Sequence, residues 1–172
     1  MLAVTAAVVL LVDIVTKLIA VAALQDQPPV RLLGGALYLT LVRNTGAAFG
    51  LGNGYTVVIT LIAIAVTVVI IRFARQLGSR PWGIALGLIL GGALGNLIDR
   101  VFRDPAPFRG AVIDFLSLFD DSGDVWPVFN IADACLVVGV LLAVVLELTG
   151  RRLDGTRVGH SERDETSKPQ HG

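Results

Sequence analysis

The sequence predicts an all-α membrane protein with four transmembrane helices and a small extracytoplasmic β-sheet or hairpin. Hydrophobic residues make up 54% of the 172 residues and charged residues only 16%, whereas a soluble domain carries about 25% charged residues. The apolar residues gather in four runs of about 20, the helix length that crosses a hydrocarbon core of about 30 Å. The length is that of one domain. We place this membrane-embedded domain at 1–150 and a polar tail at 151–172.

The first apolar run, 2–24, contains two charged residues, Asp13 and Lys17. The small residues at 20–22 resemble the cleavage site of a signal peptide, but no basic segment precedes the run and two charges interrupt it. These features favour a retained helix. The other three predicted helices lie at about 55–74, 81–98 and 128–148.

The connections between the helices differ in character. Within 30–42 a glycine pair separates two β-favouring runs, which predicts a short hairpin or small sheet on the membrane surface. The connection 99–127 is rich in Asp, Gly and Pro, and its residues 120–124 form a predicted turn. The stretch from 150 to the end is polar and lacks periodicity, so we expect it to be disordered.

The arginines predict the orientation of the helices. They gather in the link between the second and third helices (Arg72, Arg75 and Arg80) and after the fourth helix (Arg151, Arg152 and Arg157). Short loops rich in basic residues face the cytoplasm. We therefore expect both termini to be cytoplasmic, and the connections 25–54 and 99–127 to face outward.

Several kinds of chemistry are disfavoured by composition. The net charge of +0 implies no strong electrostatic attraction to nucleic acid. Both histidines, His160 and His171, lie in the tail, which leaves no Ser-His or Cys-His pair and no zinc-binding H-E-x-x-H helix in the body of the protein. The single cysteine, Cys135, lies in an apolar segment, where cysteines are usually inert. Carboxylates must therefore carry any hydrolytic chemistry, and we expect no metal or cofactor.

Ionisable residues inside a span cost about 2.5–3.5 kcal/mol each on insertion scales, so each one requires a reason. Asp13 and Lys17 are four residues apart and share a helix face, which favours a mutually neutralising structural pair. Asn96, Asp99 and Arg100 follow a run of small residues that permits close helix packing. Two interpretations of them stay open: a packing motif closed by an interfacial charged cap, or a site that Asn96 and Arg100 line.

Two further carboxylates lie at the predicted outer boundary of the membrane. Asn130 is a candidate N-cap for the fourth helix, but Asp133 lies in an apolar stretch where a structural role is hard to justify. Asp114 lies in the apolar run 111–116, which we expect to re-enter the membrane surface. Two carboxylates held close in an apolar site share a proton, and such a pair can activate water as general base and general acid. The pattern therefore favours Asp114 and Asp133 as a catalytic pair.

The motifs together resemble the lipoprotein signal peptidases, also called signal peptidase II, a family of bacterial intramembrane aspartic proteases. Any one block is a weak signal, but five blocks in the family's order are highly specific. They are Asp13–Lys17, Asn44–Phe49, Gly91–Arg100, Val112–Phe115 and Phe129–Asp133.

The resemblance implies roles for these residues. It assigns the catalytic pair to Asp114 and Asp133. It places substrate contacts at Asn44, Arg100, Asn96 and Asn130, and supporting residues at Asp13, Lys17 and Asp99. The aromatic residues Phe49, Trp82 and Trp126 are interpreted as membrane-interface or packing residues.

The resemblance also implies a substrate and a location. The substrate is a prolipoprotein with a diacylglyceryl group on its cysteine, which is cleaved just before that cysteine at the outer leaflet of the bacterial inner membrane. Further expectations are a globomycin-type inhibitor, contact with membrane lipid and a monomeric enzyme. Two features depart from the family: the chain starts almost directly in the first helix, and the tail is not part of the family pattern.

Three other functions fit the sequence less well. A small transporter or channel subunit would use Asp13, Lys17, Asp99 and Asp133 as an ion path, but it would need polar residues at several membrane depths. A lipid transferase would need a phosphate-binding cluster or a repeated D-x-x-D array, which the sequence lacks. A non-enzymatic assembly subunit leaves the cost of burying Asp133 unexplained.

Overall fold

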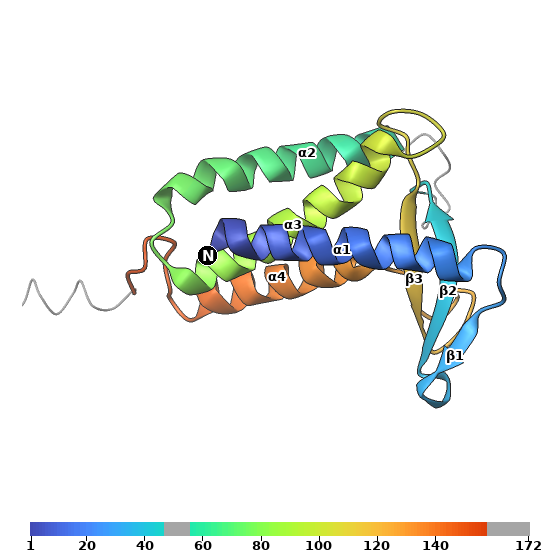
Figure 1. Cartoon of the computed structure of the whole chain (residues 1–172). Helices are drawn as coiled ribbons and strands as arrows, with labels where there is room; N and C mark the ends of the chain where they lie inside the picture. The colour runs from blue at the N-terminus through green and yellow to red at the C-terminus, as the bar shows by residue number, and fades with distance from the viewer. Residues whose placement is uncertain (47–55, 158–172) are drawn as a thin grey trace, which may run out of the picture.

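The computed structural model describes residues 1–46 and 56–157. The four helices α1 (Leu2–Leu24), α2 (Thr56–Phe73), α3 (Arg80–Phe102) and α4 (Ile131–Leu148) form an elongated bundle with a small sheet at one end (Figure 1). Each helix is long and apolar enough to cross a membrane. The prediction of four transmembrane helices with a small sheet is confirmed.

Two helix boundaries differ from the sequence prediction by more than one residue. Helix α3 continues to Phe102 instead of ending at 98, because Asp99 and Arg100 are buried in the polar cluster described below and do not form an exposed end. Helix α4 begins at Ile131 instead of 128, because Asn130 caps it. Residue 55, the expected start of the second helix, lies outside the described residues.

Helix α3 packs against the other three helices, and its glycines bring two of them close. A Cβ atom on Gly91 would lie 2.7 Å from Cβ of Val9 in α1, and one on Gly92 would lie 2.5 Å from the carbonyl oxygen of Ala132 in α4. Neither position has room for a side chain. The close helix packing expected at this small-residue run is therefore present, without an exposed charged cap, and it holds α1 and α4 against the end of α3 that bears Asn96.

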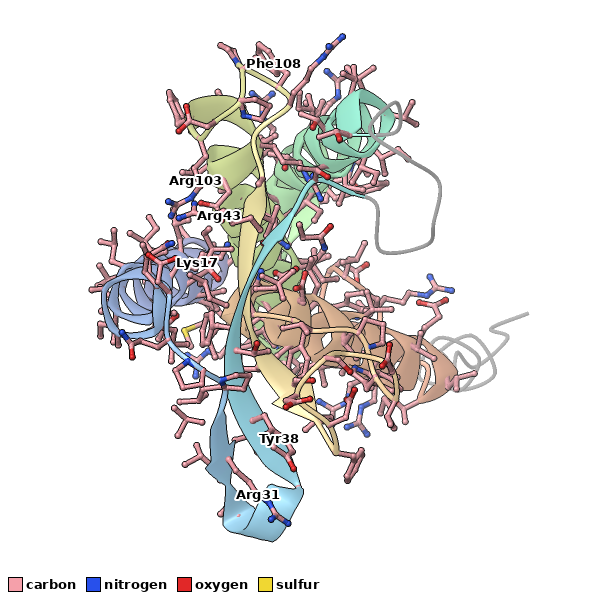
Figure 2. All side chains as sticks on the ribbon, turned by 90° about the vertical axis from the view of Figure 1, so that its right-hand side faces the viewer. Lys17, Arg31, Tyr38, Arg43, Arg103 and Phe108 are labelled. Atoms are coloured by element: carbon pink, nitrogen blue, oxygen red, sulfur yellow. The ribbon has the colours of Figure 1, made fainter. Side chains whose placement is uncertain are left out.

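The sheet is antiparallel with the order β1 (Val30–Leu32), β2 (Leu37–Asn44) and β3 (Val112–Leu118). The glycine pair forms the turn between β1 and β2, with φ of 69° at Gly34 and 102° at Gly35, where glycine is favoured. The predicted hairpin is therefore present. Figure 2 looks at the molecule from this side, where the strands cross in front of the helix ends and the hairpin bearing Arg31 and Tyr38 extends beyond them.

Strand β3 was missed by the sequence prediction, which expected a segment that re-enters the membrane surface. Its first four residues are buried, so the alternation of apolar and polar residues that marks a half-exposed strand is weak. The sequence feature that could have indicated a strand here is its content of β-branched and aromatic residues. The strand pairs Val42 of β2 with Asp114, and a buried cluster of Ile113 and Phe115 with Ala20 and Leu24 fixes it to α1.

The chain after α4 is hydrogen-bonded as far as the structure describes it. Arg151 and Arg157 form an isolated β-bridge, and the carbonyl oxygen of Leu153 accepts hydrogen bonds from Gly78 N at 2.9 Å and Ser79 N at 3.0 Å. Residues 151–157 thus differ from the expected disordered tail. Residues 158–172, with both histidines, lie outside the described residues.

Candidate active site

Polar side chains from five elements meet where α1, α3 and α4 reach the sheet. They comprise the nine candidate residues of the sequence analysis: Asp13 and Lys17 of α1, Asn44 of β2, Asn96, Asp99 and Arg100 of α3, Asp114 of β3, and Asn130 and Asp133 at the start of α4. Most of these side chains are buried.

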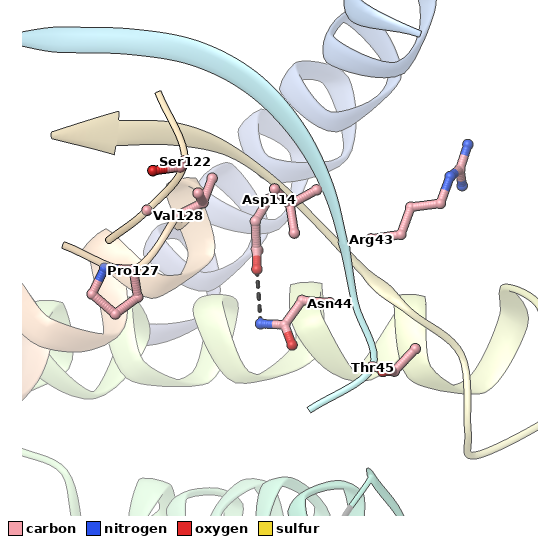
Figure 3. A pocket seen from close by; sticks show the side chains of 9 residues that line it. Arg43, Asn44, Thr45, Asp114, Ser122, Pro127 and Val128 are labelled. Atoms are coloured by element: carbon pink, nitrogen blue, oxygen red, sulfur yellow. Dashed lines mark hydrogen bonds between the residues drawn. The ribbon is translucent and has the colours of Figure 1, made fainter. Parts of the chain in front are cut away.

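The carboxylate of Asp114 is held on both oxygens by amides. Asn44 Nδ2 donates to Asp114 Oδ2 at 2.9 Å (Figure 3), and Asn130 Nδ2 donates to Asp114 Oδ1 at 2.7 Å. The side chain is 1% exposed. Burial, and then the charge of Asp133, raise the pKa of Asp114 to about 7, although the two amide hydrogen bonds oppose this rise. A carboxyl group with such a pKa can hold or release a proton near neutral pH.

The carboxylate of Asp133 is fixed by the capping of α4. Asp133 Oδ2 accepts from the backbone N–H of Asn130 at 3.1 Å, while Asp133 N donates to Asn130 Oδ1 at 2.9 Å, which completes a capping box. The other oxygen, Oδ1, accepts from Asn96 Nδ2 at 2.7 Å. Local helix capping and a side chain from α3 therefore determine together where this carboxylate points.

Asn130 joins the two carboxyl groups. Its amide nitrogen donates to Asp114, while its backbone N–H and side-chain oxygen hold Asp133. The expected N-cap role of Asn130 is confirmed, and the residue also links β3 to α4. Because the charge of Asp133 acts on Asp114 directly, the protonation of Asp114 depends on its neighbouring carboxylate.

Lys17 is the centre of a buried ionic cluster behind this pair. Its Nζ lies 2.8 Å from Asp13 Oδ2, 2.9 Å from Asp99 Oδ2 and 3.0 Å from Asn96 Oδ1, and the side chain is 1% exposed. The predicted pairing with Asp13 is present, and Asp99 joins it from α3. Lys17 is therefore in contact with Asn96, which holds Asp133.

The two acids around Lys17 also hold backbone groups. Asp13 Oδ1 accepts from Ala132 N of α4 at 3.0 Å, and Asp99 Oδ2 accepts from Ile113 N of β3 at 3.3 Å. These two backbone groups immediately precede Asp133 and Asp114. The ionic cluster thus fixes the chain at both members of the carboxylate pair.

Arg100 lies beside the pair with part of its guanidinium free. The residue is 7% exposed, and the charges of Asp114 and Asp133 both act on it. Within the described part of the chain, its buried Nη1 has no hydrogen-bond partner. A buried cationic donor without a partner costs energy, and an incoming carbonyl or other acceptor would satisfy it.

A cavity of about 300 Å³ opens beside Asp114 and Asn44 (Figure 3). The turn of residues 120–124, for which the sequence predicts no role in the site, supplies Ser122 and Gly123 to its wall. Arg43, from β2, also lines it and donates to Gln25 Oε1 at 2.8 Å. No local motif marks these residues, since they reach the site only through the pairing of β2 with β3.

Other predicted residues have different positions. Arg103, which the sequence analysis did not select, pairs with Asp99. Trp82 is a buried packing residue, Trp126 is exposed in the β3–α4 connection, and Phe49 lies outside the described residues. Within residues 1–46 and 56–157, no group of three or more His, Cys, Asp or Glu side chains is placed to hold a metal ion.

The sequence matches the family model of signal peptidase (SPase) II over residues 5–149. The chain belongs to the signal peptidase II family. This membership confirms the resemblance that the five motifs indicated, and it identifies the protein as an aspartic peptidase.

Curated members of the signal peptidase II family are close relatives. The lipoprotein signal peptidase of Streptomyces griseus is 50% identical over 88% of this chain and 74% of that protein. The lipoprotein signal peptidase of Mycobacterium leprae is 52% identical over 87% of this chain and 72% of that protein. The one of Mycobacterium tuberculosis is 49% identical over 94% of this chain and 78% of that protein.

Two solved structures share the fold of this signal peptidase II chain, and both are described as bacterial membrane enzymes determined by the in meso method. The structure at 1.9 Å resolution has a TM-score of 0.70 and 30% identity, covering 84% of this chain and 90% of that one. The structure at 2.3 Å resolution has a TM-score of 0.71 and 28% identity, covering 98% of this chain and 92% of that one. A multi-pass membrane enzyme is therefore the right class for this protein.

Proposed function

We propose that this peptidase removes the signal peptide from prolipoproteins that carry a diacylglyceryl group on their cysteine, and that it cleaves the bond just before that cysteine. Asp114 and Asp133 form the catalytic pair. The observation that carries this assignment is the junction at Asn130, which binds both carboxyl groups in a buried site that opens to a cavity.

In the proposed reaction the pair carries one proton, which Asp114 holds because burial favours its neutral form. Asp133 takes a proton from a water molecule as that water forms a bond to the scissile carbonyl carbon, while Asp114 donates a hydrogen bond to the carbonyl oxygen. A proton then passes from the pair to the leaving nitrogen, and the C–N bond breaks. The products are a signal peptide with a new carboxylate and a lipoprotein with a free amino group on its lipidated cysteine.

We assign different roles to the polar residues around the pair. Asn44 lines the cavity, and Nη1 of Arg100 has no hydrogen-bond partner among the described residues, which supports a role for both residues in binding the substrate peptide. The side chains of Asn96 and Asn130 are occupied by Lys17, by each other and by the two carboxyl groups. They therefore position the pair, although the family resemblance grouped them with the substrate contacts.

The arrangement in the membrane is also part of the proposal. The carboxylate pair and the arginine-rich α2–α3 link lie at opposite ends of the bundle (Figure 1). If arginines mark the cytoplasmic side, both termini are cytoplasmic and the pair lies at the outer leaflet of the inner membrane, where the lipid of the substrate can stay in the bilayer. Proteolysis at 151–157 in sealed right-side-out vesicles, without permeabilisation, would contradict this orientation.

A cleavage assay with two precursors tests the proposed substrate. Purified protein in detergent should convert a diacylglyceryl-modified prolipoprotein to a shorter product on a gel, and should leave the same precursor without the lipid uncut. A globomycin-type cyclic peptide should stop the cleavage. We also propose that the enzyme is a monomer, so the rate per molecule should not depend on protein concentration. Equal cleavage of both precursors would contradict the requirement for the lipid.

The raised pKa of Asp114 predicts a pH dependence for both activity and stability. Activity should fall as pH rises through about 7, because Asp114 then loses the proton that polarises the carbonyl. The folded state binds this proton more tightly than an unfolded chain with the ordinary pKa of 3.8. Stability should therefore decrease between about pH 4 and 7, by up to about 1.4 kcal/mol per pH unit.

The variant Asp114→Asn separates this effect from other titrations, since it has no proton to lose at this position. Thermal unfolding of parent and variant in detergent at several pH values is the measurement. The melting temperature of the variant should change less between pH 4 and 7 than that of the parent. Parallel curves for the two proteins would show that Asp114 does not titrate in this range.

A further inference from the structure

A second polar cavity lies at the end of the bundle opposite the carboxylate pair. It measures about 390 Å³ and is formed by the α2–α3 link, the start of α3 and the turn after α4. Its lining includes three arginines, Arg80, Arg151 and Arg157, and no acidic side chain. We call it the arginine pocket.

The walls of the arginine pocket are held by hydrogen bonds between segments far apart in the chain. Gly78 N and Ser79 N donate to Leu153 O, and the indole of Trp82 donates to Arg151 O at 2.7 Å. A Cβ atom on Gly78 would lie 2.8 Å from the carbonyl carbon of Asp154, so the link and the turn are in close contact. The pocket is therefore a built feature of the fold and not a gap between loose loops.

Among the described residues, none of the three arginines of the pocket forms an ion pair. In the described part of the chain, the ion pairs involve only Asp13, Lys17, Asp99 and Arg103, all near the other end of the bundle. The N-terminus of α3 also lies at the pocket. The side chain of Ser79 does not cap this helix end, and Pro81 in its first turn has no N–H. The positive end of this helix adds to the three arginine charges. An anion is the ligand that this combination favours.

The surroundings of the pocket indicate that the anion belongs to a lipid. Leu77 and Leu153 pack on the buried cluster around Trp82 immediately beside the pocket. Phe73 and Leu148, at the ends of α2 and α4, are 47% and 81% exposed. In a protein with four apolar spans, the acyl chains of the bilayer end at this level. A phosphate that enters the pocket from a lipid can therefore keep its acyl chains on these apolar side chains.

We propose that the arginine pocket binds the phosphate of an anionic phospholipid in the leaflet opposite the carboxylate pair. Basic pockets at the ends of transmembrane helices suit such head groups, because phosphate accepts several hydrogen bonds from guanidinium groups. The alternative is that these arginines act only as diffuse charge that sets the orientation. Arg72 and Arg75 provide a comparison, since they lie at the same end of the bundle but do not line the pocket.

Trp82 makes the binding measurable. The chain has two tryptophans, so Trp126→Phe leaves Trp82, whose indole touches the pocket wall, as the only one. This protein is reconstituted in bilayers with increasing fractions of phosphatidylglycerol that carries brominated acyl chains, or of brominated phosphatidylcholine. Bromine quenches tryptophan fluorescence over a short range, so the quenching curves give the relative affinity of the two lipids near Trp82.

We expect the parent to bind phosphatidylglycerol more tightly than phosphatidylcholine. In the double variant Arg80→Gln with Arg157→Gln, the ratio of the two affinities should fall about fivefold for each arginine removed. The matched control, Arg72→Gln with Arg75→Gln, removes the same charge and should keep most of the preference. Both double variants should unfold in detergent at the melting temperature of the parent, which shows that they are folded.

Three results would overturn the proposal. One is equal quenching by the two lipids, and another is an equal loss of preference in both double variants, which would indicate diffuse charge only. The third is relief of the preference by inorganic phosphate but not by chloride at the same ionic strength, which would indicate a site for free phosphate. Each of these results is independent of whether the carboxylate pair acts as proposed.

Discussion

Asp133→Asn is expected to abolish cleavage of lipidated prolipoprotein while the protein still folds and inserts. The substitution keeps the size of the side chain and removes its ability to take a proton from water. Loss of a general acid or base costs about 10²–10⁴-fold in rate, and no other carboxylate among the described residues shares the junction with Asp114 at Asn130. Gel-shift cleavage by purified parent and variant, at equal folded protein, measures the effect.

Asp114→Asn should give the same loss for a different reason. It removes the carboxyl proton, and its new NH₂ group must face the NH₂ of Asn44 or Asn130, both of which now donate to this side chain. The matched control is Asp121→Asn in the exposed turn beside the cavity, which should cleave at the parent rate. Normal turnover by Asp133→Asn or Asp114→Asn would refute the catalytic assignment.

Lys17→Met is expected to have the largest effect on stability. Methionine has a similar length but leaves Asp13 without its cation, and Asp99 with only Arg103. Removing one partner of a buried ion pair costs about 3–5 kcal/mol, a large part of the stability of a typical protein. We expect a much lower yield of folded protein, and a smaller fall in the activity of the fraction that folds.

Thermal unfolding in detergent can follow this loss through the thiol of Cys135, the only cysteine. A thiol-reactive dye reports when the helix around it opens. The control is Arg103→Gln, which removes a cation from the same Asp99 at a position where the side chain is 30% exposed. Its cost should be about 1 kcal/mol or less. Equal melting temperatures for Lys17→Met and the parent would contradict a structural role for the ionic cluster.

Much of this architecture was predictable because the signals are local. Apolar runs of membrane-spanning length predict helices without reference to the rest of the chain, and Gly34-Gly35 between two β-favouring runs predicts the first hairpin. The cost of a charge in a span also draws attention to Asp13, Lys17 and Asp133 before any contact is known.

Strand β3 and the turn at 151–157 were not predictable in the same way. Asp114 lies in a segment that is a strand because β2 pairs with it, and Asn44 reaches Asp114 only through that pairing. The polar composition of 151–157 predicts disorder, but close contact with Gly78 and the hydrogen bond from Trp82 hold it in place.

By itself, the sequence determined the four spans and the residue types that carry the chemistry, since composition, length and spacing express these directly, and the resemblance of its five motifs indicated the family. Only the tertiary structure decided how the residues combine. It placed Asn130 between Asp114 and Asp133, and it placed Lys17 against Asn96, which is 79 positions away in the chain. The physical reason is that helix formation and hydropathy depend on neighbouring residues, whereas the buried charges find their partners through the packing of α1, α3 and α4.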